Sequence, residues 1–328
     1  MSKKEIFKME NVWKKVLAIL LTVLMMASMV SCVSEIEDVN GGNGSIGDTI
    51  GALKETESLP KETSTNETAA PSIEAETSAT DEITMEEKLC FEYNGIAVAA
   101  KKLVYDSWQG IGLRLNIVND TSKTYTVGVE SVIVNDCMVS DFFSCEVAAG
   151  KKANDTLYFS STELSDAGIE EIGKIEIYFY VYDSETYDRV YESECVTIKT
   201  SAYESIGADR KDDGYVLCEG KDIKIVGRYV EQYGWLGKAI VLYIENNRNE
   251  NVIVSCKEMS INGYMVSGWL YESVYAGKYA VTEISISDTD LSDNDIDKIE
   301  EFELKFEVYN PNTYNTILTT EALAFTVG

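Results

Sequence analysis

The side chains that could do chemistry are limited by one absence, because the 328-residue chain contains no histidine. Histidine is the commonest general base and the commonest neutral metal ligand. Ser-His-Asp and Cys-His catalysis are therefore excluded, as is any zinc site with a histidine ligand. A pair of carboxylates could still hydrolyse a glycoside. The acidic residues, however, fall on alternating outward positions and in loops, so we predict no catalytic residue, no cofactor and no enzymatic activity.

Cysteines offer no clear site either. No two of the seven are spaced as Cys-x-x-Cys, so no metal site is predicted. Cys32 has a separate role, described below. We expect the other six to be small buried hydrophobes or unpaired thiols, and a local Cys137–Cys145 bridge stays open. These six are Cys90, Cys137, Cys145, Cys195, Cys218 and Cys256.

An acid-rich run, Asp288 to Asp297, is reminiscent of a calcium loop. Counting an EF-hand from Asp288 places Asp293 where glycine is required, and counting from Asp290 places Asp295 there. We therefore interpret the run as acids that complement the dipole of a helix N-terminus. A calcium site of another geometry remains the alternative.

Tyrosines form the most distinctive candidate for binding. Tyr178, Tyr180 and Tyr182 alternate with apolar residues, and Tyr191 lies on the strand expected next. Exposed aromatic side chains on one face of a sheet can bind a glycan or a protein. The structural alternative is cross-strand pairing, or coverage of this face by the second half of the chain. A weaker candidate in loops consists of Tyr264, Trp269 and Tyr271.

The stretch 1–31 has the pattern of a signal peptide. Lysines precede an apolar run from Val16 to Val30, which as a helix would rise only about 22 Å, too short for a ~30 Å hydrocarbon core. The sequence Met29-Val30-Ser31-Cys32 resembles the bacterial lipobox. That resemblance implies cleavage before Cys32 and a lipid on its thiol, which would hold the chain at the outer face of the cytoplasmic membrane.

Residues 32–88 are expected to form a disordered tether. They contain Gly41-Gly42-Asn43-Gly44 and then a mixture of Thr, Ser and Glu without apolar periodicity. Low hydrophobicity with like charge cannot offset chain entropy. The whole chain carries a net charge of -28, which argues against a nucleic acid partner because phosphates would be repelled.

The rest of the chain contains two copies of one sequence unit. The stretch 96–200 aligns with the stretch 223–327 without a gap, and the alignment gives 30 identities. Asn119 aligns with Asn246, and Ala149-Gly150-Lys151 aligns with Ala276-Gly277-Lys278. Such self-similarity indicates a duplicated structural unit. We name residues 89–200 repeat one and residues 218–328 repeat two, with 201–217 as the linker.

Each repeat shows the alternation of a half-buried strand. In repeat one, Leu113, Leu115 and Ile117 alternate with Arg114 and Asn116, and the aligned positions of repeat two hold Ile240, Leu242 and Ile244. We therefore predict an all-β fold with two tandem immunoglobulin-like antiparallel β-sandwiches of seven or eight strands each. A short helix is expected at 164–172 and at 291–299.

The repeats resemble immunoglobulin-like domains of uncharacterised Gram-positive surface lipoproteins. The resemblance rests on Asn262-Gly263-Tyr264-Met265-Val266, on residues 149–155 (Ala-Gly-Lys-Lys-Ala-Asn-Asp) and on Leu164-Ser165-Asp166. It implies a fold and a location but no activity. We therefore expect a membrane-anchored extracellular lipoprotein that acts as a non-enzymatic binding or spacer module. The alternative is a structural subunit that docks onto another envelope protein or transporter.

Overall fold

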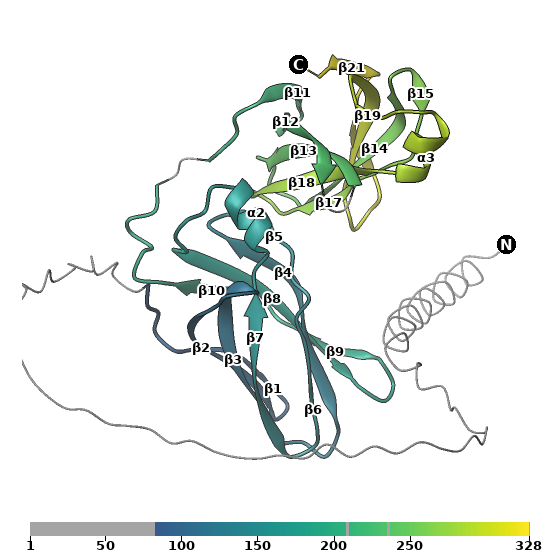
Figure 1. Ribbon diagram of the computed structural model, residues 1–328. Coiled ribbons are helices and arrows are strands. Elements are labelled where there is room, and N and C mark those ends of the chain that lie inside the picture. Colours follow the sequence, from purple (N-terminus) through teal and green to yellow (C-terminus); the bar gives the residue numbers. More distant parts are fainter. Residues whose placement is uncertain (1–82, 208–209, 235–236, 328) are drawn as a thin grey trace, which may run out of the picture. The chain divides into compact units, whose positions relative to one another are not determined.

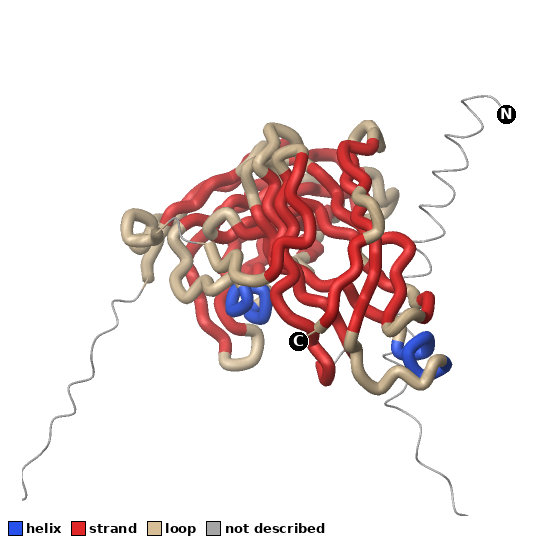
Figure 2. The backbone as a smooth tube through the Cα atoms, turned by 90° about the horizontal axis from the view of Figure 1, so that it is seen from above, coloured by secondary structure: helices blue, strands red, loops and turns tan. Residues whose placement is uncertain are grey.

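Strands dominate the computed structural model, which describes residues 83–207, 210–234 and 237–327. The expected signal peptide, Cys32 and nearly all of the expected tether lie outside these residues. The described residues form antiparallel sheets with two short helices, so the predicted all-β class is confirmed (Figure 2). No helix among them is long and apolar enough to cross a membrane.

The elements of repeat one follow one another along the chain and are labelled in Figure 1. They are β1 (Lys88–Tyr93), β2 (Ile96–Asp106), β3 (Gly110–Asn119), β4 (Tyr125–Val134), β5 (Cys137–Val139), β6 (Ser144–Val147), β7 (Lys151–Tyr158), α2 (Ser161–Asp166), β8 (Lys174–Asp183), β9 (Arg189–Glu192) and β10 (Val196–Lys199).

Repeat two contains the same series with one additional short strand. It comprises β11 (Tyr215–Gly220), β12 (Ile223–Gly234), β13 (Gly237–Asn246), β14 (Val252–Ile261), β15 (Tyr264–Met265), β16 (Gly268–Trp269), β17 (Tyr271–Val274), β18 (Tyr279–Ile286), α3 (Asp288–Asp293), β19 (Glu301–Tyr309), β20 (Thr316–Thr319) and β21 (Leu323–Thr326).

The alignment of the two repeats carries over to the structure almost residue for residue. Strands β1, β3, β4, β6, β9 and β10 and helix α2 coincide at both ends with β11, β13, β14, β17, β20, β21 and α3 in this alignment. Each repeat has more strands than the seven or eight predicted, because short strands form at the edges.

Two sheets enclose the core of each repeat. In repeat one, β1-β2-β3-β7 form one sheet, and β4, β5, β6, β8, β9 and β10 belong to the other. Leu113, Leu115 and Ile117 of the first sheet pack with Ile175, Ile177 and Phe179 of the second. A corresponding core in repeat two includes Leu242, Ile244, Leu304 and Phe306. The packing is sandwich-like, as period-two alternation requires.

One pairing departs from the antiparallel pattern. Strand β5 of repeat one pairs in parallel with β18 of repeat two, with Cys137 opposite Tyr279 and Met138 opposite Ala280. We call the contact between the two repeats at this pairing the joint. It merges strands of both repeats into one 11-stranded sheet. A third buried cluster lies beside it and contains Cys137, Ala167, Val226, Val241, Tyr243, Tyr279 and Val281.

Charged side chains also bridge the joint. Lys278 Nζ lies 2.6 Å from Asp136 Oδ1 and 2.5 Å from Glu176 Oε2, and Lys174 contacts the same two carboxylates. The Lys278 side chain retains only 15% of its exposure. Ion pairs with so little solvent around them are screened less by salt than pairs on an open surface.

Several predicted boundaries differ from the observed ones. The helices begin at Ser161 and Asp288, one turn earlier than predicted, because Ser160 and Ser287 accept N-cap hydrogen bonds from Glu163 N–H and Asp290 N–H. They end at Asp166 and Asp293, six residues before the predicted ends. Strand β11 begins at Tyr215, inside the expected linker. The expected disordered tether includes 83–88, but Thr84 and Met85 pair with Ser201 and Thr200.

Buried asparagines tie loops together in both repeats. Asn119 Nδ2 donates to the carbonyls of Lys123 and Val147, each at 2.8 Å, and its Oδ1 accepts from Thr121 N–H. In the same way, Asn246 Nδ2 donates to the carbonyls of Glu250 and Val274, and its Oδ1 accepts from Arg248 N–H. Both side chains have no exposed surface. Each asparagine thus supplies partners for backbone groups that would otherwise be buried unpaired.

We expect Asn119→Ala to lower the free energy of unfolding by about 2 kcal/mol, because the buried Val147 carbonyl and the part-buried Lys123 carbonyl lose their donor. Urea denaturation followed by circular dichroism measures the change. Asn116→Ala is the control, since Asn116 bonds Asn154 on the outer face and should cost below about 0.5 kcal/mol. Equal losses for the two variants would contradict the assigned role.

Candidate functional site

The predicted tyrosine candidates lie on β8 and β9. Tyr178, Tyr180 and Tyr182 alternate along β8 with the buried Ile177, Phe179 and Val181, so they point away from the core, as predicted. We call these three side chains the tyrosine row. All three are half-buried rather than exposed. Contacts within the chain account for this coverage.

Repeat two covers one end of the tyrosine row. The Tyr178 ring meets the Tyr275 ring edge-on, with 5.1 Å between the centroids. The Tyr275 hydroxyl accepts a hydrogen bond from Ser131 Oγ at 2.9 Å, which fixes the ring over repeat one. Tyr178 therefore takes part in the joint, in agreement with the structural alternative.

Arg189 and Gly128 both lie against Tyr180, the middle residue of the tyrosine row. The Arg189 guanidinium lies 4.2 Å from the centre of the Tyr180 ring, a cation–π distance. Arg189 is held there by Glu130 and Glu192 at 2.7 and 2.9 Å. On the neighbouring strand, a Cβ at Gly128 would lie 2.3 Å from the Tyr180 ring, so only glycine leaves room for it.

The last tyrosine of the row belongs to a feature shared by both repeats. Tyr182 stacks with Tyr187 at 6.2 Å, and the equivalent Tyr309 stacks with Tyr314 at 6.4 Å. A contact present in both repeats is explained by the hairpin that both share. Within the row, only Tyr178 and Tyr180 are specific to repeat one.

Tyr191 does not join the tyrosine row. The β8–β9 register places Tyr191 opposite Val181, whose side chain is buried, so Tyr191 faces the core side. Its ring lies 4.6 Å from Tyr93 and 4.9 Å from Phe91. The grouping of Tyr191 with the row is therefore wrong. A register shift between Val181 and Tyr182 brings Arg189 opposite Tyr182 on the outer face.

Aromatic side chains of repeat two are far more open. Trp269 is 73% exposed, Tyr271 56% and Tyr264 51%. We call these three residues the aromatic edge. They lie on the short strands β15, β16 and β17, which follow one another along the chain. Strands β15 and β17 pair with β14, and β16 pairs with β18. The buried strand β5 of repeat one is the equivalent of β15, whereas Phe142 and Ser144, the equivalents of Trp269 and Tyr271, are exposed.

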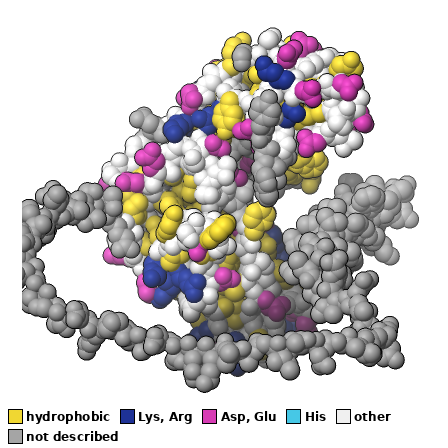
Figure 3. Space-filling view, viewed as in Figure 1, with side chains coloured by type: hydrophobic (Ala, Val, Ile, Leu, Met, Phe, Trp, Pro, Cys, Tyr) yellow, Lys and Arg dark blue, Asp and Glu magenta, His cyan; other side chains and the backbone are white. Residues whose placement is uncertain are grey.

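Acidic side chains are frequent on the molecular surface. The viewed face in Figure 3 shows Asp and Glu side chains among hydrophobic and basic ones, and the whole chain has a net charge of -28. A chain of this charge suits uncharged or cationic partners better than anionic ones.

Acidic side chains also meet in a cleft near the joint. Asp141, Glu163 and Glu272 line a cavity of about 340 Å³, which we call the acidic cleft. Burial raises the pKa of Glu272 to about 7, with a further contribution from Glu163. Burial also raises the pKa of Glu163, whose Oε2 accepts a hydrogen bond from Ser140 N–H at 2.6 Å.

The acidic cleft brings carboxylates together, the feature that glycoside hydrolysis would require. Burial raises the pKa of all three acids, and one oxygen of Glu163 accepts a hydrogen bond from the backbone. The cavity is also at the small end of ligand pockets.

The acid-rich run from Asp288 to Asp297 contains helix α3. Asp288 and Asp290 lie in the first turn, and Asp290 Oδ2 accepts a hydrogen bond from Ser267 N–H at 2.5 Å. No group of three or more Cys, Asp or Glu residues in the described parts of the chain has metal-site geometry. The helix-terminus interpretation accounts for these contacts.

All six described cysteines are free thiols. Cys137 and Cys145 are buried and form no bridge, so the alternative of a local disulfide is wrong. Burial raises the pKa of Cys137 to about 12. Since the thiolate is the reactive form, this thiol is inert at neutral pH.

We expect Glu272→Gln to change the pH dependence of stability. Folded Glu272 holds its proton to about pH 7, whereas the carboxyl in the unfolded chain ionises near its ordinary pKa of 4.5. The folded state binds more protons between these values, so stability falls as the pH rises through them. The variant should gain about 1–3 kcal/mol at pH 8 and nothing at pH 4.

Urea denaturation at both pH values measures this difference. Glu283→Gln is the control, because Glu283 lies exposed on the neighbouring strand β18. The assignment fails if Glu272→Gln changes stability by the same amount at pH 4 and pH 8.

Comparisons with known proteins identify no relative. No protein-family model matches the chain, and no curated protein matches it in sequence. Among solved structures, the YadV chaperone aligns with a TM-score of 0.23 and 9% identity, covering 69% of this chain and 98% of its own. A protein of unknown function from Porphyromonas gingivalis W83 aligns with a TM-score of 0.18 and 9% identity, covering 71% and 90%. At these scores neither similarity bears on function.

Proposed function

We propose that this protein is a lipoprotein anchored through Cys32 at the outer face of the cytoplasmic membrane. In this proposal the two repeats are immunoglobulin-like and act together as a non-enzymatic binding module at the cell surface. The lipobox-like Met29-Val30-Ser31-Cys32 supports the anchor. Two acyl chains on one residue suffice for stable membrane attachment.

The observation that carries the binding function is the aromatic edge. Tyr264, Trp269 and Tyr271 are each more than half exposed, and the β5 residue equivalent to Tyr264, Cys137, is buried in repeat one. Exposed aromatic groups of this size are typical of sites that bind a glycan or a protein. The tyrosine row is a poorer candidate, because Tyr275 and Arg189 already occupy it.

A role as an accessory subunit of another envelope protein is the second candidate. The open edge of β15 favours it, because strand edges with unpaired backbone groups readily pair with another chain. Such a subunit would use the aromatic edge to dock and would need no ligand of its own.

The anchor is tested with Cys32→Ala. We expect this variant to lose incorporation of a labelled fatty acid and to leave the membrane fraction, because the acyl acceptor is gone. Cys90→Ala is the control and should leave both properties unchanged. Labelling that persists in Cys32→Ala would refute anchoring at this residue.

The aromatic edge is tested with the triple change Tyr264→Ser, Trp269→Ser and Tyr271→Ser. Binding to purified cell-wall fractions, glycan arrays and extracellular-matrix proteins is measured with the full-length chain in lipid nanodiscs. We expect saturable binding that weakens at least tenfold in the variant, since each ring contributes about 0.5–1.5 kcal/mol beyond its buried area.

Phe142→Ser is the matched control, because Phe142 occupies the position of Trp269 in repeat one and is 99% exposed. Circular dichroism verifies folding. Binding that survives the triple change would exclude the aromatic edge. If neither protein binds any of these probes, the accessory-subunit role gains support, and crosslinking in the native envelope would identify the docking partner.

A further inference from the structure

The first and last strands of each repeat lie at the same side of the sandwich, on different sheets. Strands β1 and β10 do so in repeat one, and β11 and β21 do so in repeat two. At this side the two repeats differ, and the difference indicates a second binding site.

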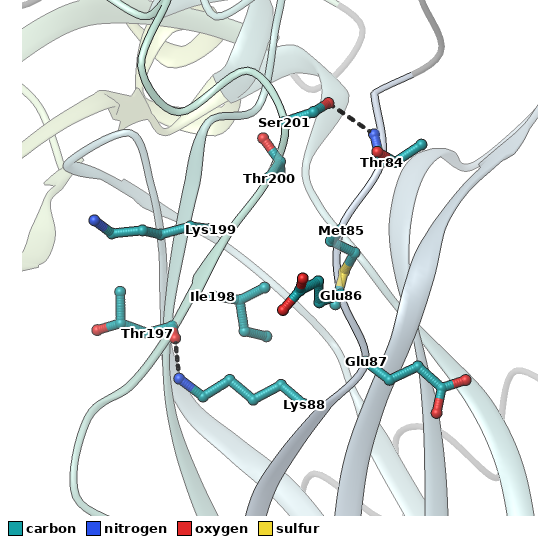
Figure 4. Close-up of a pocket in the computed structure, with 10 residues that line it drawn as sticks. All are labelled: Thr84, Met85, Glu86, Glu87, Lys88, Thr197, Ile198, Lys199, Thr200 and Ser201. Atoms are coloured by element: carbon teal, nitrogen blue, oxygen red, sulfur yellow. Dashed lines mark hydrogen bonds between the residues drawn. The ribbon is translucent and has the colours of Figure 1, made fainter.

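In repeat one, residues 84–88 close this side. Ser201 N–H donates to the Thr84 carbonyl at 2.8 Å, and Met85 forms an antiparallel bridge with Thr200. Figure 4 shows the bond from Thr84 N–H to Ser201 Oγ, at 3.0 Å, and the bond from Lys88 Nζ to the Thr197 carbonyl. The Met85 side chain packs against the core, and a groove of about 770 Å³ remains between the bonds.

This extended segment covers the inward side chains of β10 and of the residue that follows it. Val196, Ile198 and Thr200 are 7%, 2% and 8% exposed. Repeat one therefore contains an extended segment that is bridged to the residues just after β10, with one apolar side chain packed against the core.

In repeat two the corresponding segment is directed elsewhere. Asp212 takes the place of Met85, and its carboxylate pairs with Lys224 of β12 at 2.6 Å. The inward side chains that match those of β10 are Leu323, Phe325 and Val327, and all three are only half-buried. In repeat two, this segment therefore places no apolar side chain at the position equivalent to Met85.

The result is a cleft of about 770 Å³ with apolar walls. Leu217 and Ile240 line one side, and Phe302, Phe325 and Val327 line the other. We call it the edge cleft. Its volume is within the usual range for a ligand site, and its apolar walls belong to or pack against the core of repeat two.

A buried cation also lines the edge cleft. The Arg228 side chain is 10% exposed. One terminal nitrogen donates to the Asp166 carbonyl at 2.5 Å and the other lies 3.4 Å from Asp213. Arg228 Nε, in contrast, is buried without a hydrogen-bond partner. Asp166 and Asp213 thus hold the terminal nitrogens of Arg228, a residue of the cleft wall.

The strand edge beside the edge cleft is open. Among the described strands, β21 pairs only with β19. Val327 N–H points toward β19, because it donates to the Glu300 carbonyl at 2.7 Å. Since N–H groups alternate along an antiparallel strand, those of Ala324 and Thr326 point outward.

We propose that the edge cleft of repeat two binds an extended peptide by strand addition along β21. The peptide places an apolar side chain where repeat one holds Met85. Strand addition of this kind draws affinity from backbone bonds and specificity from the pockets for alternate side chains. The edge cleft is lined by none of the residues of the aromatic edge, so this proposal does not depend on the proposed function.

The probe is a fluorescein-labelled peptide with the sequence of residues 80–88, which contains the Met85 segment. Fluorescence polarisation measures its binding to the full-length chain in lipid nanodiscs. We expect saturable binding that falls at least tenfold for Thr326→Pro, which removes an outward N–H and leaves the β19 ladder intact. The same loss is expected when the peptide carries Met85→Asp.

Lys199→Pro is the matched control, because Lys199 holds the position of Thr326 in repeat one. This variant should bind the peptide as the unchanged protein does. Hydrogen–deuterium exchange provides a second measurement, and added peptide should protect the amides of Ala324 and Thr326. Absence of both polarisation change and protection in the unchanged protein overturns the proposal. Equal binding by Thr326→Pro, with folding verified by urea denaturation, also overturns it.

Discussion

Strand edges carry backbone N–H and C=O groups that must find partners, and this requirement organises the whole structure. Repeat one covers two of its edges with other parts of the chain. Its β5 edge pairs with β18 of repeat two, and residues 84–88 lie beside β10 and bridge to Thr200 just after it. Repeat two has the equivalent edges at β15 and β21, and neither is covered in the same way. Both binding proposals concern these uncovered edges.

The joint exists because the repeats differ on one sheet face. In β3 the outward side chains include Arg114 and Asn116, which hydrogen-bond to neighbours on β7. Their equivalents on β13 are Val241 and Tyr243, which are buried. Burial of this apolar face stabilises the contact between the repeats, and the bonds from Lys278 to Asp136 and Glu176 add an ionic component.

Much of the fold could be predicted from the sequence. The alternation of Leu113, Leu115 and Ile117 predicted the core face, and the gapless alignment of the two repeats matched their strands. The sequence also carries a signal for the joint, because β13 is apolar at Val241 and Tyr243, where a half-buried strand would be polar.

The candidate site was harder to predict, for physical reasons. A bulge in the β8–β9 pairing moved Tyr191 to the core side, and bulges leave no clear mark in side-chain alternation. Coverage of Tyr178 by Tyr275 depends on how distant segments pack, which local patterns do not encode. The edge cleft did leave a trace, in the replacement of Met85 by Asp212 at equivalent positions.

The outer face of β13 has a consequence for how such chains can grow by gene duplication. A unit copied from repeat one would present the polar Arg114 and Asn116 to its neighbour. It would remain a separate domain with this face in contact with water. A unit copied from repeat two would bring Val241 and Tyr243 but would meet Tyr264 where the joint has Cys137. The two repeats can therefore no longer replace each other, and their order along the chain is set by which surface each of them buries.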